Sequence, residues 1–139
     1  LYIELLEHVG RDLVTHVTQE ATSAGEDGRE KTMRGMVAYF SWVSANRDAF
    51  TLIFESSSRV DEEFADIVKQ FEDAAAAAIA PLITAPVSAD DQRTFALGLV
   101  GMAEAVSRHL IAEHVDFDPV AMGNAIGGLA WAGLRSIGD

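Results

Sequence analysis

Two segments near the C-terminal end of the chain are apolar on nearly every side of a helix, and this feature constrains the fold most. Between residues 89 and 114, two apolar stripes run along well-separated faces. The first is Phe95, Leu99, Met102, Val106 and Leu110, and the second is Leu97, Val100 and Ile111. Small residues fill much of what remains, including Gly98, Gly101 and Ala105. A helix with so few polar positions must be buried on several sides.

The last segment, from about Asp118 to Ile137, has the same character and adds glycines at 123, 127, 128 and 133. Each glycine inside a helix costs roughly 0.5–1 kcal/mol relative to alanine, and close approach of another backbone usually compensates. Two adjacent terminal helices cannot both be central in one small domain, so the sequence predicts a homodimer with a four-helix bundle across a two-fold axis. The alternative is that the small-residue faces pack only within one chain. The predicted interface residues are Leu97, Val100, Glu104, Arg108, Ile111, Trp131 and Leu134.

The rest of the chain also has helical periodicity, which predicts an all-α protein of five or six helices without strands. The expected helices cover residues 1–23, 29–45, a short stretch after Asn46, about 61–80, 88–114 and 118–137. Gly25 is a stop signal, Pro81 should end or kink the fourth helix, and Ser88 and Asp118 are N-cap candidates. Residues 56–58 are predicted to be a loop. No linker divides the sequence, so residues 1–139 are predicted to form a single domain.

Composition excludes several classes of protein. The 139 residues hold 10 Lys+Arg against 22 Asp+Glu, for a net charge of −12, which disfavours binding to nucleic acid or to an anionic membrane. There is no cysteine, hence no disulfide, thiolate zinc site or Cys nucleophile, which fits a cytoplasmic location. The longest apolar stretch, residues 74–83, is far short of the ~20 needed to span a bilayer. No signal peptide is visible, and the start within a helix without Met suggests a fragment.

Motifs for catalysis, metals or cofactors are not found in the sequence. His109 and His114 have the wrong spacing for a zinc-protease motif, because they point about 140° apart on a helix. Glu4, His8, Asp12 and His16 recur every fourth residue, a pattern more typical of a solvated helix face than of a metal site. We therefore expect no enzyme, no metal and no cofactor. A small enzyme that uses Glu104, Arg108 and His109 is a remote alternative.

Aromatic and sulfur-containing side chains are numerous enough to wall an apolar pocket with a few polar groups. The predicted ligand-binding residues are Met36, Phe40, Phe54, Phe71, Met102 and His109. Each also fits an ordinary core position. We expect a mainly apolar pocket bounded by the three phenylalanines and Met102, suited to a small apolar or amphipathic molecule.

The order of several segments resembles TetR-family transcriptional regulators. These segments are Tyr39–Trp42, Asn46–Phe50, Leu52–Ser56, Gly98–Ala105, Arg108–Leu110, Asp118–Ala121 and Leu129–Leu134. The resemblance implies an all-α effector-binding and dimerisation domain, whose last two long helices form the dimer bundle. It also implies a repressor whose effector, bound within the helices, moves the first helix and releases operator DNA. The N-terminal helix-turn-helix is absent from these residues, so DNA binding is expected only through that missing domain.

A second hypothesis is a helical protein-interaction module without a small-molecule ligand. It would use the same apolar helices for a different partner. A pocket in the structure would favour the first hypothesis over the second.

Overall fold

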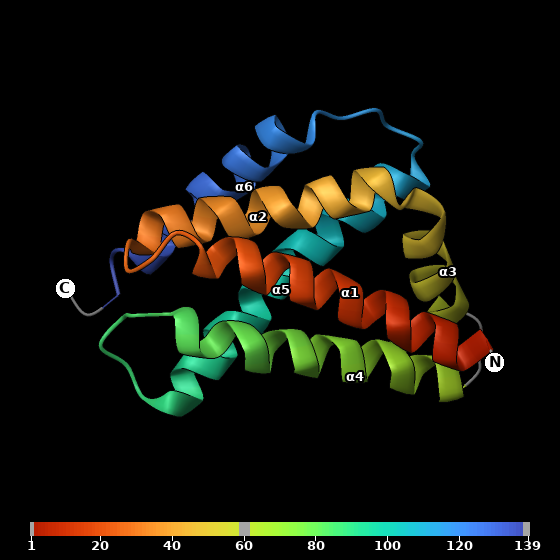
Figure 1. Ribbon diagram of the computed structural model, residues 1–139, viewed down its shortest axis with the longest axis horizontal. Helices are drawn as coiled ribbons and strands as arrows, with labels where there is room; N and C mark the ends of the chain where they lie inside the picture. Colours follow the sequence, from red (N-terminus) through yellow and green to blue (C-terminus); the bar gives the residue numbers. More distant parts are fainter. Residues whose placement is uncertain (1, 59–61, 138–139) are drawn as a thin grey trace.

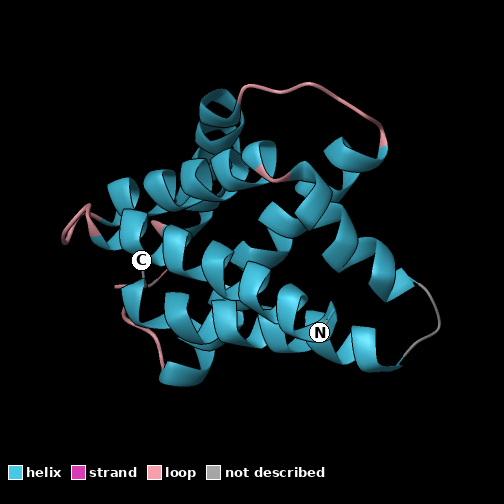
Figure 2. Ribbon diagram, turned by 45° about the vertical axis from the view of Figure 1, so that its right-hand side comes forward, coloured by secondary structure: helices cyan, strands magenta, loops and turns pink. Residues whose placement is uncertain are grey.

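The computed structural model describes residues 2–58 and 62–137, and within these ranges it contains six α-helices and no strand. The helices are α1 (Tyr2–Thr22), α2 (Gly28–Ala45), α3 (Arg47–Ser58), α4 (Glu62–Ile79), α5 (Ala89–Ala112) and α6 (Pro119–Leu134), with a 3-10 turn, η1, at Ala80–Leu82 (Figure 1). Figure 2 shows the same helices with short connecting loops. The predicted all-α fold is confirmed.

Helix ends follow the capping signals of the sequence. The Asp118 carboxylate accepts a hydrogen bond from the backbone N–H of Val120 at 3.0 Å, and Pro119 follows at the first helical position. The Ser88 hydroxyl accepts from the N–H of Asp91 at 3.1 Å. Gly25 has a φ of +70° in the turn after α1, a conformation that glycine adopts without strain. These interactions fix where α1, α5 and α6 begin or end.

Three predicted boundaries are wrong. Residues 56–58 continue α3 instead of forming a loop, so the three serines did not break the helix. The helix α5 ends at Ala112, two residues early, because His114 has a φ of +52°, outside the helical region. The helix α6 ends at Leu134 rather than near Ile137. The predicted start at Asp61 lies outside the described residues.

The helices are arranged around α1 and α2, which run antiparallel to each other (Figure 1). On one side α4 lies along α1, and on the other side α6 packs on α2. The helix α5 crosses behind this layer from the α4 side toward the end of α2, and α3 closes the end of the molecule near the N-terminus. This crossing leaves room between α1, α2 and α5 at the opposite end.

The core is built from apolar side chains of α1, α2 and α3 and is extended by α4 and α5. Its largest fully buried members are Leu6, Leu13, Phe40, Val43 and Phe50. The rings of Phe50 and Phe54 lie 4.4 Å apart between centroids, and Phe54 meets Phe71 edge to face at 6.2 Å. This aromatic cluster joins α3 to α4 at the end of the molecule that holds the N-terminus.

The glycines of α5 and α6 divide into two groups. A Cβ at Gly123 would overlap the backbone of Val37, and a Cβ at Gly127 would lie 2.8 Å from the Met33 sulfur. These two glycines let α6 approach the backbone of α2. By contrast, a Cβ added at any of the other four would have no atom within 4 Å, and these four, Gly98, Gly101, Gly128 and Gly133, face outward. Close packing within the chain therefore explains only the first group.

By length and composition alone, α5 could cross a membrane, since it has 24 residues and its most apolar stretch of 18 residues has a mean hydropathy of 1.3. A third of that stretch is buried inside the chain. Its N-terminal turn carries Asp90 and Asp91, and Glu104 and Arg108 lie farther along. Burial of one face by the neighbouring helices accounts for much of this apolar character.

Candidate functional site

A cavity of about 260 Å³ lies at the end of the molecule away from α3. Five helices and the segment between α4 and α5 contribute to its wall. Its lining residues are Val17 and Ala21 of α1, Gly28, Lys31, Thr32, Gly35, Met36 and Tyr39 of α2, Ile79 of α4, Leu82–Pro86, Leu99, Val100 and Ala103 of α5, and Trp131, Leu134, Arg135 and Ile137 at the C-terminal end. The cavity is therefore assembled from residues far apart in the sequence.

The wall has an apolar part and a polar part. Met36, Leu99, Val100 and Ala103 supply aliphatic surface from α2 and α5. Lys31, Thr32, Thr84 and Arg135 supply polar and cationic groups at the end near the α1–α2 turn. A concave, mostly apolar site with a few polar groups is the usual form of a small-molecule site, and the volume of this one lies just below the common range of ~300–1,000 Å³.

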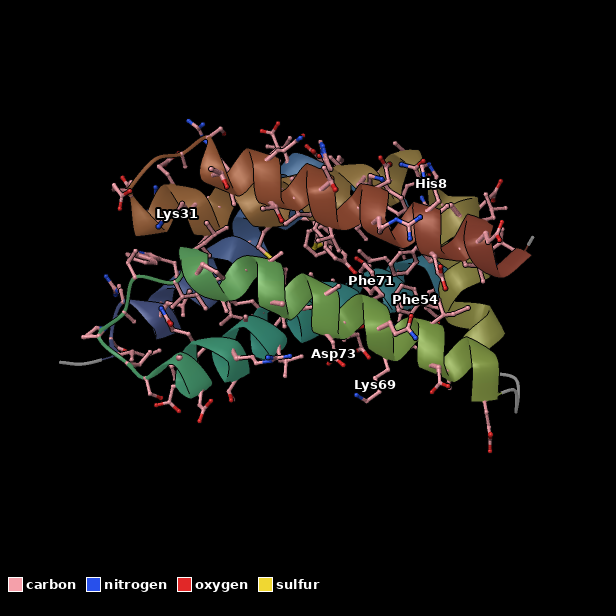
Figure 3. The ribbon with its side chains drawn as sticks, turned by 60° about the horizontal axis from the view of Figure 1, so that its bottom comes forward. His8, Lys31, Phe54, Lys69, Phe71 and Asp73 are labelled. Carbon is pink, nitrogen blue, oxygen red and sulfur yellow. The ribbon has the colours of Figure 1, made fainter. Side chains whose placement is uncertain are left out.

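Of the predicted ligand-binding residues, only Met36 lines this cavity. Phe40 and Phe54 are buried in the core, Met102 packs against it, and His109 is exposed on α5. Phe71 lines a second hollow of about 300 Å³ between α1 and α4. Figure 3 shows Phe54 and Phe71 together, well away from Lys31. Phe40 and Phe54 therefore pack in the core, whereas the cavity near Lys31 lies farther along the bundle. That the other predicted residues bind a ligand stays a prediction.

The predicted interface residues are divided between the inside and the outside of the chain. Val100, Trp131 and Leu134 line the cavity, and Ile111 is half-buried. Glu104 is buried by its own chain, with 5% of its surface exposed. Leu97 and Arg108 are exposed on α5. Since Val100 and Glu104 are covered within one chain, they are left out of the pairing surface proposed below.

A buried polar cluster lies beside the cavity. Glu104 of α5 lies close to the Glu72 carboxyl group of α4, which repels its negative charge and favours its protonated form by a hydrogen bond. Burial, this hydrogen bond and the Glu72 charge raise the pKa of Glu104 to about 8. Arg108 opposes the shift, with its Nη1 3.6 Å from the Glu104 Oε1. Two carboxyl groups that share one proton cannot both ionise without repulsion.

Tyr39 connects this cluster to the cavity wall. Burial raises the pKa of its phenol, and the charges of Glu104 and Glu72 act in the same direction. Its hydroxyl is buried and has no hydrogen-bond partner in the described part of the chain. The phenol therefore stays neutral and keeps a free donor next to the cavity.

Of the residues that recur every fourth position on α1, namely Glu4, His8, Asp12 and His16, Asp12 has a structural role. The Asp12 carboxylate accepts a hydrogen bond from the Trp42 indole N–H at 3.0 Å, which ties α1 to α2. His8 points outward from α1 (Figure 3). Among the residues that the structure describes, no group of three His, Asp or Glu side chains could hold a metal ion.

Sequence reasoning missed much of the cavity wall, including Lys31 of α2. A signal was present, because Lys31, Gly35 and Tyr39 follow one another at four-residue spacing and therefore share one face of α2. This signal is ambiguous, however, because a lysine on the same helix face as a glycine and a tyrosine usually indicates a solvent-exposed face rather than a cavity wall. Only the crossing of α5 and α6 over this face turns it into a cavity.

The chain matches a known family over most of its length. Residues 29–131 match the family model described as tetracyclin repressor-like, C-terminal domain. The match runs from the start of α2 to Trp131 near the end of α6, and it includes Lys31, Met36, Tyr39 and the α5 residues of the cavity wall.

Proposed function

Because the chain belongs to the tetracyclin repressor-like family through its C-terminal domain, we propose that it senses a small molecule and dimerises as part of a transcriptional regulator. The domain type is a ligand-sensing regulatory domain, and nothing in its polar cluster resembles a nucleophile with an activating base. The observation that carries the proposal is the cavity at the α1–α2 turn end, whose wall draws on α1, α2, α5 and α6 together.

The position of α1 supplies a route for signalling. Val17 and Ala21, near its C-terminal end, line the cavity, and 21 residues of helix span about 32 Å at ~1.5 Å per residue. A ligand that binds one position of α1 better than another shifts the equilibrium toward that position. In a regulator whose DNA-reading domain precedes α1, this shift would change operator affinity, and DNA binding would by reciprocity weaken ligand binding.

The two tryptophans of the chain allow a direct test of ligand binding. Trp131 lines the cavity, whereas Trp42 is buried in the core and bound to Asp12. A panel of small apolar and amphipathic compounds would first be screened for a ligand. We expect that ligand to change the fluorescence emission of the Trp42→Phe variant, which retains only Trp131, and the change to saturate as ligand is added. The Trp131→Phe variant, which retains only Trp42, should show little change. A change confined to Trp42 would place binding elsewhere and argue against this cavity.

The outer faces of α5 and α6 support dimerisation. On α5, Leu97, Gly98, Gly101, Ala105, Arg108 and Ala112 are exposed and fall within one arc of about 100°. On α6, Ala121, Ala125, Gly128, Leu129 and Ala132 are exposed on one face. Leu129 is 64% exposed, an unusual degree for a leucine in so apolar a helix. A second copy of the chain that packs these faces together would bury them in a four-helix bundle.

Introducing a charge at Leu129 tests this dimer. We expect the Leu129→Glu variant to be monomeric near 14.9 kDa by sedimentation velocity at micromolar concentration, where the unmodified chain is a dimer. The matched control is Leu52→Glu on α3, which is 41% exposed on a different helix and should leave the dimer intact. A dimer that survives Leu129→Glu would show that α6 does not form the interface.

A further inference from the structure

We propose that the ligand of the cavity is a small amphipathic organic anion, whose charged group binds Lys31 and Arg135 and whose apolar body lies against α2 and α5. This inference rests on the proposed sensing function and adds the chemical class of the ligand. It stands on the burial of Lys31, on the distribution of charge around the cavity, and on the shape of the wall.

Lys31 is the first observation. The residue is 8% exposed and lines the cavity, and its side chain forms no hydrogen bond or ion pair within the described part of the chain. Figure 3 shows it on α2 at the end of the molecule where the cavity lies. The aliphatic stem of Lys31 is covered by the chain, whereas its ammonium group is not among the buried polar atoms that lack a partner and so keeps contact with solvent. An anion in the cavity would supply the missing partner.

The charge distribution is the second observation. Most described cations, namely Arg11, Arg29, Arg34, Arg47, Lys69 and Arg108, pair with a carboxylate of the chain. Lys31, Arg93 and Arg135 form no ion pair among the described residues, and two of these three line the cavity. No Asp or Glu is found among the described lining residues, although the chain has 22 acidic residues. The cavity is therefore a cationic site within an acidic protein, which favours an anionic ligand.

The apolar part of the wall indicates the chemistry of the uncharged part of the ligand. Met36, Leu99, Val100 and Ala103 offer aliphatic surface without charge. The volume of about 260 Å³ lies just below the ~300–1,000 Å³ of common ligand pockets, which favours a small molecule. A short-chain carboxylate or a comparable aromatic acid has this combination of one anionic end and one apolar end. A large planar or polyanionic molecule does not.

The test compares probes that differ only in the charged group. Isothermal titration calorimetry would measure octanoate, octyl phosphate and 1-octanol binding to the chain and to its Lys31→Met, Lys31→Arg and Arg93→Met variants. We expect octanoate or octyl phosphate to bind at least tenfold more tightly than octanol. Lys31→Met should remove most of this preference, Lys31→Arg should restore it, and the control Arg93→Met should leave it unchanged. Whichever anion binds more tightly identifies the headgroup.

The outcomes separate this inference from the proposed function. If octanol binds as tightly as the anions, or if Lys31→Met keeps the preference, the anion inference is overturned and the ligand cavity stands. If none of the three probes binds the chain up to millimolar concentration, both the inference and the cavity's sensing role are contradicted. Because Lys31→Met keeps the apolar stem of the side chain and breaks no ion pair of the described chain, we expect it to fold, and circular dichroism would confirm this.

Discussion

Replacing Gly123 with alanine is expected to lower the free energy of unfolding by about 3 kcal/mol, the largest effect expected of alanine at any described glycine. A Cβ at this position would overlap the Val37 backbone, with the Val37 nitrogen only 2.6 Å away. Backbone atoms cannot rotate away as a flexible side chain can, so α6 would have to move off α2. Urea unfolding followed by circular dichroism at 222 nm would measure the loss.

Gly133 provides the matched control on the same helix, because it is not among the residues proposed to pair with a second copy. No atom lies within 4 Å of a Cβ added there, so Gly133→Ala should cause no overlap within the chain. Its higher helix propensity should leave stability unchanged or raise it by roughly 0.5–1 kcal/mol. Equal effects of the two substitutions would show that α6 does not approach α2 as closely as described.

The second large effect is a pH dependence of stability that depends on Glu104. Folding raises the pKa of this carboxyl from 4.5 to about 8, so the folded chain binds the proton more tightly than the unfolded chain. Its stabilising contribution is therefore full below about pH 4.5 and is lost as the pH rises toward 8. Between pH 5 and pH 8 we expect a loss on the order of 2–3 kcal/mol from this group, at ~1.4 kcal/mol per pH unit as an upper bound.

Glu104→Gln isolates this contribution, because glutamine keeps the shape and a hydrogen-bond donor without titrating. We expect the variant to gain about 2–3 kcal/mol of stability relative to the unmodified chain between pH 5 and pH 8. Urea unfolding at each half unit of pH would give the difference. The control is Glu113→Gln at the exposed end of α5, which should leave the pH dependence as it is. A Glu104→Gln curve parallel to that of the unmodified chain would contradict the shared proton with Glu72.

The sequence predicts the helices of this fold well, because their signals are local. The N-caps at Ser88 and Asp118, the turn at Gly25 and the break at Pro81 act through neighbouring backbone groups, and all appear where the residues indicate. Residues 56–58 show the limit of this reasoning. Serine is favoured at caps and turns, but its cost inside a helix is only about 0.5 kcal/mol, and here three serines continue α3.

The site was harder to predict, since it depends on how the helices cross. Phe40, Phe54 and Phe71 have the composition of a pocket wall, but packing between α2, α3 and α4 leaves them in the core. Trp131 and Leu134, which the sequence predicts at the dimer interface, also line the cavity within one chain. Periodicity gives the face on which a residue lies, whereas the neighbour that covers the face is set by the tertiary arrangement. For α5 and α6, that neighbour is partly the same chain and partly, we propose, a second copy.

The most direct test of the central claim is native mass spectrometry of the purified chain with octanoate and 1-octanol at matched concentrations. A ligand-sensing dimer predicts a species of twice 14.9 kDa that takes up one small molecule per chain, while Leu129→Glu gives the monomer. A species that stays at 14.9 kDa across the micromolar range and takes up neither compound would contradict it.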